Sequence, residues 1–486
     1  MDFKIRTTKT KSGKIGVQVV NYTKRKVNVF KHLGSATNDE EVEVLKKKAG
    51  NWVLMEMNKK GLFGTNKDSY FSNYQYLGFT YAYAYEFLEK IYHKFNFQNH
   101  VSDLFKDLVI ARILEPKSKR DSLVFLQTFL GIMHSENILY KMIAKYDDAT
   151  KDNLEKEIVK IAKSDFGFDF SFVLYDVTTL YFESFKSDNF KKCGFSKDHK
   201  NNQPQIVIGL MVTKEGFPLS YEVFSGNTFE GNTFLPCILD FKKKHSVGQI
   251  TVVADSAMIS KQNLDKLLES GLNYIIASRL ANLKESLINK IDDEIKRTEG
   301  SSIRIDNLVV DYSNKRYKKD KAELDKQTEK AKLNLNARTE KISNIKYLKN
   351  DKVERYLNQE LIDKNTKLLG LKGYTTNLKK ENREIVDYYH NLVKIEHAFR
   401  IAKSDLEVRP IYHHKEESIK NHMLICFMAL AMSVYLELKN KRSIHSIVEE
   451  LKSVTDAKIL NVLTNEVIFD RVKDCGKTKK LENLSY

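Results

Sequence analysis

Two aspartates occur in segments that otherwise predict buried β-strands. Asp176 lies in the middle of FVLYDVTTLYF (172–182), and Asp255 ends the apolar run of ITVVADSAM (250–258). A lone carboxylate in such a strand costs several kcal/mol unless another group compensates its charge. Two carboxylates that meet repel each other unless a cation lies between them, and their oxygens suit a hard ion such as Mg²⁺. The two residues are therefore candidate metal ligands, and the alternative is a structural aspartate that caps an element or accepts hydrogen bonds.

A third carboxylate, Glu396, interrupts the apolar face of LVKIEHAFRIAK, which has a helical pattern. In an α-helix, Arg400 lies one turn further along the same side. Tyr389 and Lys403 return to that side seven residues before and after Glu396. A polar stripe of this kind usually indicates a solvated helix face. Its significance depends on whether the fold brings this helix to the two aspartates.

The segment from residue 170 to 280 predicts the sheet that would bring Asp176 and Asp255 together. FVLYDVTTLYF is followed by IVIGLMVT and FPLSYEVF, then by a helix, the strand ITVVADSAM, a second helix and the strand NYIIASRL. Three antiparallel strands followed by a β-α-β unit indicate an α/β core of the ribonuclease-H-like class, a mixed five-stranded sheet with flanking helices. In such a sheet the first and fourth strands are neighbours, so we expect the two aspartates to lie side by side.

The rest of the chain divides by composition and periodicity around this core. A stretch rich in Lys, Glu and Asn, with a charged helical pattern, separates the core strands from the helix of Glu396. The expected parts are a basic β-rich N-terminal region that contacts DNA (1–60), a helical DNA-binding domain (61–165), the first part of the core (166–284), an insertion subdomain (285–370), the second part of the core with the Glu396 helix (371–445) and a C-terminal helical tail with a dimer contact (446–486). For the N-terminal region, a solvated sheet edge guarded by lysines is the alternative.

The composition limits the class of partner. The formal net charge of +17 favours a polyanion, either nucleic acid or an anionic membrane surface. The longest apolar run, residues 423–438, is shorter than the roughly 20 residues that span a bilayer, so it predicts a buried core helix. The chain opens without a signal-peptide pattern and its four cysteines form no CxxC pair, which favours a cytoplasmic protein. The sequence has no GxxxxGK[ST] loop, which argues against nucleotide hydrolysis.

Several segments together resemble the DDE transposases of bacterial insertion sequences, in the insertion-sequence-four superfamily: YDVTTLYFE, GFSKDHKNNQPQIVIGLMV, FSGNTFEGNTF, VADSAMIS, YIIASRL, GYTTN and IEHAFRIAKSDLEVRPIYHH. The resemblance extends from SGKIGVQVVNY near the start to the helix near residue 440. It implies that Asp176, Asp255 and Glu396 are the catalytic carboxylates and the ligands of two Mg²⁺ ions, for which Mn²⁺ can substitute. It also implies two-metal phosphoryl transfer, with one ion at the attacking oxygen and the other at the leaving oxygen.

The same family carries a Tyr-x2-Arg-x3-Glu-x6-Lys signature around its glutamate. Tyr389, Glu396 and Lys403 fit it, whereas Leu392 stands where the arginine is expected. This departure puts one phosphate contact in doubt, and Arg400 is the candidate to replace it. The residues expected to bind DNA phosphates are Tyr389, Arg400, Lys403, Arg279, Lys197 and Lys200. The alternatives are a surface ion pair for the arginine at 279 and an ordinary exposed loop for the lysines at 197 and 200.

The resemblance implies double-stranded DNA as the partner, both the inverted-repeat ends of an element and the target, held by a homodimer. We expect no membrane partner, because no basic amphipathic helix is paired with an exposed Trp or Phe face, and no nucleotide cofactor, because the GxxxxGK[ST] loop is missing. The expected location is the bacterial cytoplasm, with association to the nucleoid when the protein is bound to DNA. Two alternatives remain open. A ribonuclease-H-like nuclease would cut without joining, and a non-catalytic or co-opted DNA-binding protein would keep the fold without the activity.

Overall fold

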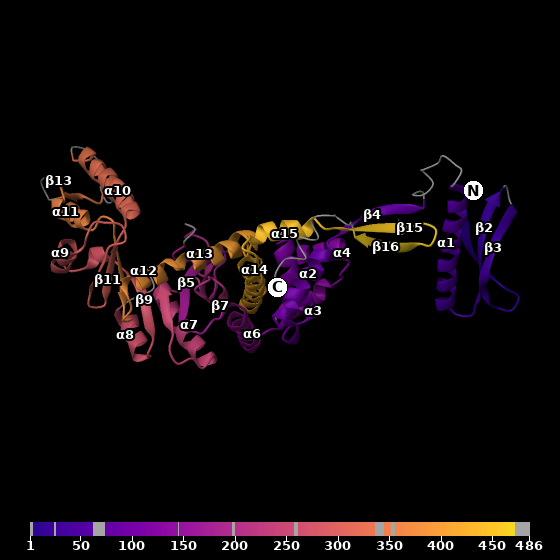
Figure 1. Ribbon diagram of the computed structural model, residues 1–486, viewed down its shortest axis with the longest axis horizontal. Coiled ribbons are helices and arrows are strands. Elements are labelled where there is room, and N and C mark those ends of the chain that lie inside the picture. The colour runs from indigo at the N-terminus through magenta and orange to yellow at the C-terminus, as the bar shows by residue number, and fades with distance from the viewer. Residues whose placement is uncertain are drawn as a thin grey trace. The chain divides into compact units, whose positions relative to one another are not determined.

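The computed structural model describes residues 3–23, 26–61, 73–143, 145–196, 200–256, 261–335, 345–350 and 355–471 (Figure 1). The chain separates into two compact units. The first comprises Met1–Leu88, Val124–Met133 and Ile447–Leu484, and the second comprises Glu89–Leu123, His134–Ser446 and Ser485–Tyr486.

A three-stranded antiparallel sheet opens the first unit. Helix α1 (Asp39–Gly61) packs against strands β1 (Lys4–Lys9), β2 (Ile15–Thr23) and β3 (Lys26–Ala36). Val17 and Val19 of β2 form a small core with Ala49 and Val53 of the helix. Gly13, at a φ of 80°, supplies the left-handed residue that the β1–β2 turn requires. β1 and β2 therefore form an antiparallel hairpin around this turn.

The C-terminal segment differs from the expected helical tail. After α15 (Ile444–Lys452) the chain forms the hairpin β15 (Asp456–Asn461) and β16 (Glu466–Arg471), and β15 also pairs with β4 (Tyr74–Thr80). The β-branched and aromatic residues of EVIFDR favour a strand. Asn465, at a φ of 55°, adopts the left-handed conformation in the turn, and Arg471 Nε donates to Asp456 at 2.7 Å across the hairpin.

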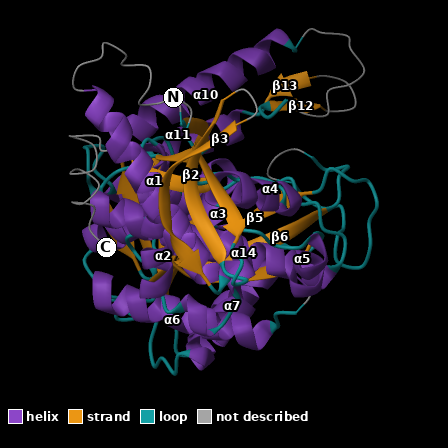
Figure 2. Cartoon of the chain, turned by 90° about the vertical axis from the view of Figure 1, so that its right-hand side faces the viewer, coloured by secondary structure: helices purple, strands orange, loops and turns teal. Residues whose placement is uncertain are grey.

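An eight-stranded mixed sheet lies in the second unit, and Figure 2 labels two of its strands, β5 (Phe172–Tyr181) and β6 (Gln205–Val212). Its strand order is β10-β11-β14-β9-β8-β5-β6-β7. β6 pairs antiparallel with β5 and β7, whereas β8 pairs parallel with β5 and with β9. The strands are β5 (Phe172–Tyr181), β6 (Gln205–Val212), β7 (Pro218–Ser225), β8 (Thr251–Ala254), β9 (Asn273–Ser278), β10 (Ser302–Ile305), β11 (Leu308–Tyr312) and β14 (Leu371–Thr376).

The five strands expected for a ribonuclease-H-like core are all present as neighbours, in the order β7-β6-β5-β8-β9. The expected total of five strands is wrong, because three later strands extend the sheet. β14 pairs antiparallel with β9, and the hairpin β10–β11 pairs with β14. These strands cover the edge that β9 would otherwise expose, and an unpaired edge is a liability for association with other chains.

Helices flank the sheet, with α7 packed against β5, β6 and β7, α12 against β8 and β9, and α13 against β5 and β6. The charged stretch of the insertion forms α10 (Asn314–Leu333), as predicted. It is followed in the sequence by two short strands, β12 (Leu348–Asn350) and β13 (Arg355–Leu357), which pair with each other. The remaining helices are α2 (Ala82–Lys94), α3 (Asp103–Leu114), α4 (Lys119–Leu130), α5 (Glu136–Ile143), α6 (Asp148–Phe166), α7 (Glu230–Lys244), α8 (Lys261–Glu269), α9 (Glu285–Glu294), α10 (Asn314–Leu333) and α11 (Gln359–Lys367).

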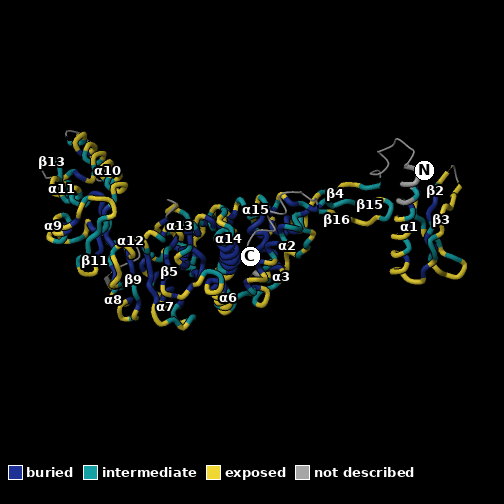
Figure 3. Tube along the Cα trace, viewed as in Figure 1, coloured by how far each residue is buried: buried dark blue, intermediate teal, exposed yellow. Residues whose placement is uncertain are grey.

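Helix α14 (Glu416–Asn440) contains the apolar run that predicted a core helix. Within the described part of the chain, it alone is long and apolar enough to cross a membrane, yet 94% of its most apolar window is buried inside the protein. It packs against α3 and β7 and is coloured as buried in Figure 3. Burial of this extent is typical of the core helix of a folded domain.

The single helix expected from Asn382 to Asp405 is divided into three parts. α12 (Asn382–His390) and α13 (Leu392–Arg400) meet at Asn391, and a π-helical turn follows at Ile401–Asp405. Tyr389 and Glu396 therefore lie on different helices, and Lys403 lies in the π turn. The expectation that a spacing of seven residues puts Tyr389, Glu396 and Lys403 on one side of a single α-helix is therefore wrong. π turns of this kind are frequent at functional sites.

Candidate functional site

The register of β5 with β8 brings Asp176 and Asp255 side by side. The parallel pairing matches Leu174 with Val253, so the next residues on the same face of the sheet are these two aspartates. Neighbouring strands lie about 4.8 Å apart, which places the two carboxylates next to each other. Asp176 is half-buried and Asp255 is exposed. Such a pair is the arrangement in which a cation between the carboxylates is favourable.

Tyr389, on α12, contacts the second of these carboxylates. Its hydroxyl donates to Asp255 Oδ1 at 3.3 Å, and the same oxygen accepts from Ser256 N at 2.6 Å. Burial raises the pKa of Tyr389 well above its usual value, and the negative charges of Asp255 and Asp176 act in the same direction. The phenol therefore keeps its proton at neutral pH and acts as a hydrogen-bond donor that orients the carboxylate.

Glu396 lies on a helix that packs on the strand of Asp176. α13 contacts β5 and β6, and the Glu396 side chain is exposed to solvent. Among the described residues, no group of three or more His, Cys, Asp or Glu side chains is close enough to hold a metal ion. The described residues thus place Glu396 on a helix that packs against β5 but do not assemble it with the two aspartates into a three-carboxylate site.

Lys403 shares the sheet face of Asp176. It lines a small cavity with Thr178 and Leu180, which lie two and four residues after Asp176 and therefore on the same face of β5. The other described lining residues of this cavity are mostly apolar, so the expected phosphate contact of Lys403 stays a prediction.

Arg400 is engaged elsewhere. Its Nη2 donates to His397 Nδ1 at 2.6 Å, and His397 Nε2 donates to a carboxylate oxygen of Glu437 at 2.6 Å. The guanidinium is thus held by a chain of contacts to α14. Leu392, at the position where the signature has arginine, is buried with only 9% of its surface exposed. Neither residue places a cation beside the aspartates in this structure.

The other predicted phosphate ligands have different positions. Arg279 follows β9, is exposed, and lines a cavity together with Asp255. Lys200 is exposed, with its ammonium 5.9 Å from the ring centroid of Tyr181 at the end of β5. Lys197 lies outside the described residues.

The cavity beside Asp255 is lined by basic residues that were not among the predicted phosphate ligands. It has a volume of about 510 Å³ and reaches from Asp255 and Tyr389 to the insertion. Lys372 of β14, Arg316 of α10 and Lys346 contribute to its wall. In the sequence, a functional role of Lys372 is indicated only by its position directly before the segment GYTTN, which begins at Gly373.

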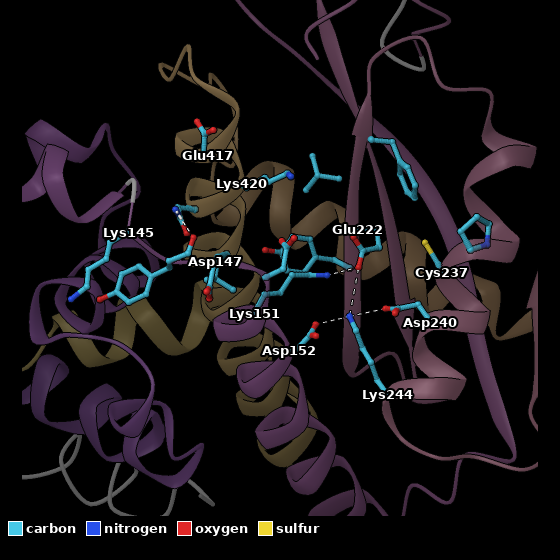
Figure 4. A pocket seen from close by; sticks show the side chains of 18 residues that line it. Lys145, Asp147, Lys151, Asp152, Glu222, Cys237, Asp240, Lys244, Glu417 and Lys420 are labelled. Carbon is cyan, nitrogen blue, oxygen red and sulfur yellow. Dashed lines mark hydrogen bonds and ion pairs between the residues drawn. The ribbon is translucent and has the colours of Figure 1, made fainter. Parts of the chain in front are cut away.

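A larger cavity, of about 630 Å³, lies at the opposite end of the sheet beside β7 (Figure 4). Its cations are matched by acids: Lys244 Nζ is 2.6 Å from Asp152 and 2.7 Å from Asp240, and Lys151 pairs with Glu222. None of the three predicted carboxylates is among its described lining residues. A neutralised network of this kind connects α6, α7 and β7 and has a structural role.

A buried group of basic side chains lies away from both cavities. Lys119 and Arg112 are 6% and 4% exposed, and the rings of His413 and His422 lie 5.5 Å apart. Burial lowers the pKa of Lys119 to about 7, and the positive charge of Arg112 acts in the same direction. Burial likewise lowers the pKa of His413 to about 4, with Lys119 and Arg112 adding to the effect.

We expect Lys119→Met to raise the free energy of unfolding at pH 7 by about 1–4 kcal/mol, because it removes a desolvated cation and keeps an apolar stem of similar volume. Between pH 7 and 10.5 the unfolded wild-type chain binds a proton that the folded chain does not, so its stability rises with pH across this window. Urea denaturation at several pH values measures both effects. A variant that is less stable than the wild type at pH 7, or that keeps the same rise with pH, contradicts the prediction.

Comparison with known proteins gives three findings. The sequence matches the family described as "Transposase DDE domain" over residues 167–432. Among solved structures, the chain is similar to a piggyBac transposase in a synaptic complex with hairpin DNA, determined by cryo-electron microscopy, with a TM-score of 0.39 and 10% sequence identity over 72% of this chain and 69% of that chain. No curated protein sequence matches the chain.

Proposed function

The chain belongs to the transposase DDE domain family, and from this premise we propose that it is a DNA transposase that cuts and joins DNA at the ends of an insertion sequence. One observation carries the proposal. Asp176 lies on β5 and Asp255 directly follows the adjacent parallel strand β8, both inside the region that matches the family, and Tyr389 donates to Asp255. We place the protein in the insertion-sequence-four superfamily on the strength of the segments and signature residues described above.

In the proposed reaction the three carboxylates, Asp176, Asp255 and Glu396, would hold two Mg²⁺ ions, which when bound would supply Lewis acidity to the attacking and leaving oxygens of the phosphodiester. Tyr389 keeps its proton and fixes Asp255 through its hydrogen bond. In the first step water attacks a phosphodiester at the element end, and the 3′-oxygen of that bond leaves as a free 3′-hydroxyl. In the second step this 3′-hydroxyl attacks a phosphodiester of the target, and the 3′-oxygen of the target strand leaves.

DNA binding is proposed to involve the N-terminal region as well as the site. Residues 1–34 contain nine Lys or Arg and one acid, and the strands β1 to β3 carry most of them. Positive charge in this density binds phosphates without regard to sequence. A homodimer would hold two element ends, and residues 446–486 are the proposed dimer contact.

The test uses purified protein and a labelled duplex that ends in the inverted repeat of the element. We expect nicked and joined products with Mg²⁺ or Mn²⁺, and binding without products when Ca²⁺ replaces them or when a chelator removes them. Cutting without joined products would identify a nuclease instead. Binding without cutting in Mg²⁺ and Mn²⁺ would leave a non-catalytic DNA-binding protein.

A further inference from the structure

The cavity beside Asp255 has one more basic than acidic residue among its described lining residues. Its basic lining residues are Arg279, Arg316, Lys346 and Lys372, and its acidic ones are Asp255, Asp320 and Glu323. Arg316 Nε lies 3.5 Å from Asp320, so one pair is internally neutralised. The volume of about 510 Å³ lies in the range of ligand-binding pockets.

Lys372 is the basic residue that reaches the predicted catalytic residues. Its ammonium lies 4.1 Å from the ring centroid of Tyr389, a favourable cation–π distance, and the hydroxyl of that ring donates to Asp255. Burial lowers the pKa of Lys372, Arg316 adds to this effect, and the negative charges of Asp255 and Glu396 oppose it. The ammonium is thus partly desolvated, and an incoming anion would stabilise its charged form.

Strand pairing brings Lys372 and Arg279 to the same cavity. β14 and β9 are antiparallel, and their register ends with the pair Gly373 and Ser278. Lys372 and Arg279 are the residues directly beyond this pair, one on each strand's continuation, and both line the cavity. Two basic residues therefore come to the cavity from neighbouring segments, and β14 belongs to the part of the sheet that follows the insertion.

We propose that this cavity binds a phosphate group of the DNA backbone next to the bond that is cut, and that Lys372 provides the cation that Leu392 cannot. The inference rests on the proposed function, since it assigns a DNA contact at the same site. Leu392 is buried and apolar, and Arg400 Nη2 donates to His397, so neither of these two positions offers a cation to a phosphate there. Lys372, from a different element, occupies the position beside Tyr389 and Asp255.

The experiment measures binding of the element-end duplex in Ca²⁺ at several salt concentrations. We expect Lys372→Gln to weaken binding about tenfold or more, as for a lost charge-assisted contact, and to lower the slope of log K against log salt by about one. Lys372→Arg should retain most of the affinity. Lys266→Gln, an exposed lysine of α8 outside the cavity, is the matched control and should stay within about twofold of the wild type.

A phosphate scan then locates the contact. Each phosphate near the element end is replaced singly by an uncharged methylphosphonate. In the wild type one position should weaken binding strongly, and in Lys372→Gln that same position should have no further effect. Thermal unfolding checks the fold of the variant, and Arg279→Gln, at an exposed position of the same cavity, should show the same loss at the same phosphate if Lys372→Gln is unstable.

Wild-type affinity and salt slope in a folded Lys372→Gln would overturn the inference, as would an equal loss in Lys266→Gln. If Lys372→Gln does not fold, wild-type affinity and salt slope in Arg279→Gln would overturn it instead. Binding and joining are separate readouts. If the wild type forms joined products in Mg²⁺ and Lys372→Gln binds DNA normally, only the proposed phosphate contact is contradicted. If binding is lost selectively at one phosphate but no joined products form, only the proposed transposase activity is contradicted.

Discussion

Replacing Asp176 with asparagine should abolish cleavage and strand transfer, with rates at least about 10³-fold lower, while the protein still binds DNA. Asparagine has the same shape but lacks the charge that a divalent cation requires. In the folded protein Asp176 lies next to Asp255, so the substitution also removes a repulsion between two carboxylates. The melting temperature should therefore be unchanged or higher. Single-turnover cleavage of a labelled element end in Mg²⁺, together with binding in Ca²⁺, measures the two effects.

Asp293→Asn provides the matched control, because this aspartate is exposed on α9 and makes the same chemical change outside the site. It should cut and join at the wild-type rate. If Asp176→Asn retained activity within tenfold of the wild type, the assignment of the aspartate pair to metal binding would be wrong. A joint loss of activity and of melting temperature would instead indicate a structural role for Asp176.

The catalytic strands were predictable because their local pattern and their tertiary environment agree. β5, β6 and β8 are buried on nearly every residue and β9 on three of its six residues, so each has a run of apolar, β-branched or aromatic side chains that is typical of a covered strand. A polar residue such as Asp176 is conspicuous in such a run. The order of strands and helices then restricts the pairing, which made the alignment with Asp255 predictable.

The three added strands of the sheet and the position of Lys372 beside Tyr389 could not be predicted from local sequence patterns. β11 and β14 pair with each other although α10 and α11 lie between them in the sequence. Nothing in the local sequence of either strand identifies its partner. A lysine in a short strand ordinarily indicates a solvated face. Only the pairing of β14 with β9 brings Lys372 to Tyr389.

The break between α12 and α13 escaped prediction for a different reason. Residues 382–405 have a helical pattern throughout, and Asn391 keeps a helical conformation, with φ of −66° and ψ of −12°. No proline or glycine marks the boundary. A periodicity that continues through the break predicts that Tyr389 and Glu396 share a face of one helix, whereas the structure uses two helices to reach β8 and β5.

The second large effect concerns stability. We expect Glu155→Ala to lower the free energy of unfolding by about 3–5 kcal/mol, as when one partner of a buried ion pair is removed. Glu155 is 1% exposed on α6, and its oxygens lie 3.5 Å from Lys151 Nζ and 3.6 Å from Lys244 Nζ. It also accepts hydrogen bonds from Ser220 Oγ at 2.9 Å and from Tyr221 N at 3.2 Å, both on β7. Alanine leaves these donors unsatisfied and the two lysines partly uncompensated.

Urea denaturation of three variants separates the contributions. Glu155→Gln keeps an acceptor for the β7 donors and removes only the charge, so its loss should be smaller than that of Glu155→Ala. Lys156→Ala, at an exposed position of the same helix, should change stability by no more than about 0.5 kcal/mol. A loss below 1 kcal/mol for Glu155→Ala would show that Asp152, Asp240 and Glu222 compensate the lysines without it. The expected loss would show instead that Glu155 fastens α6 to β7, the outer strand of the antiparallel β5-β6-β7 arrangement that positions Asp176.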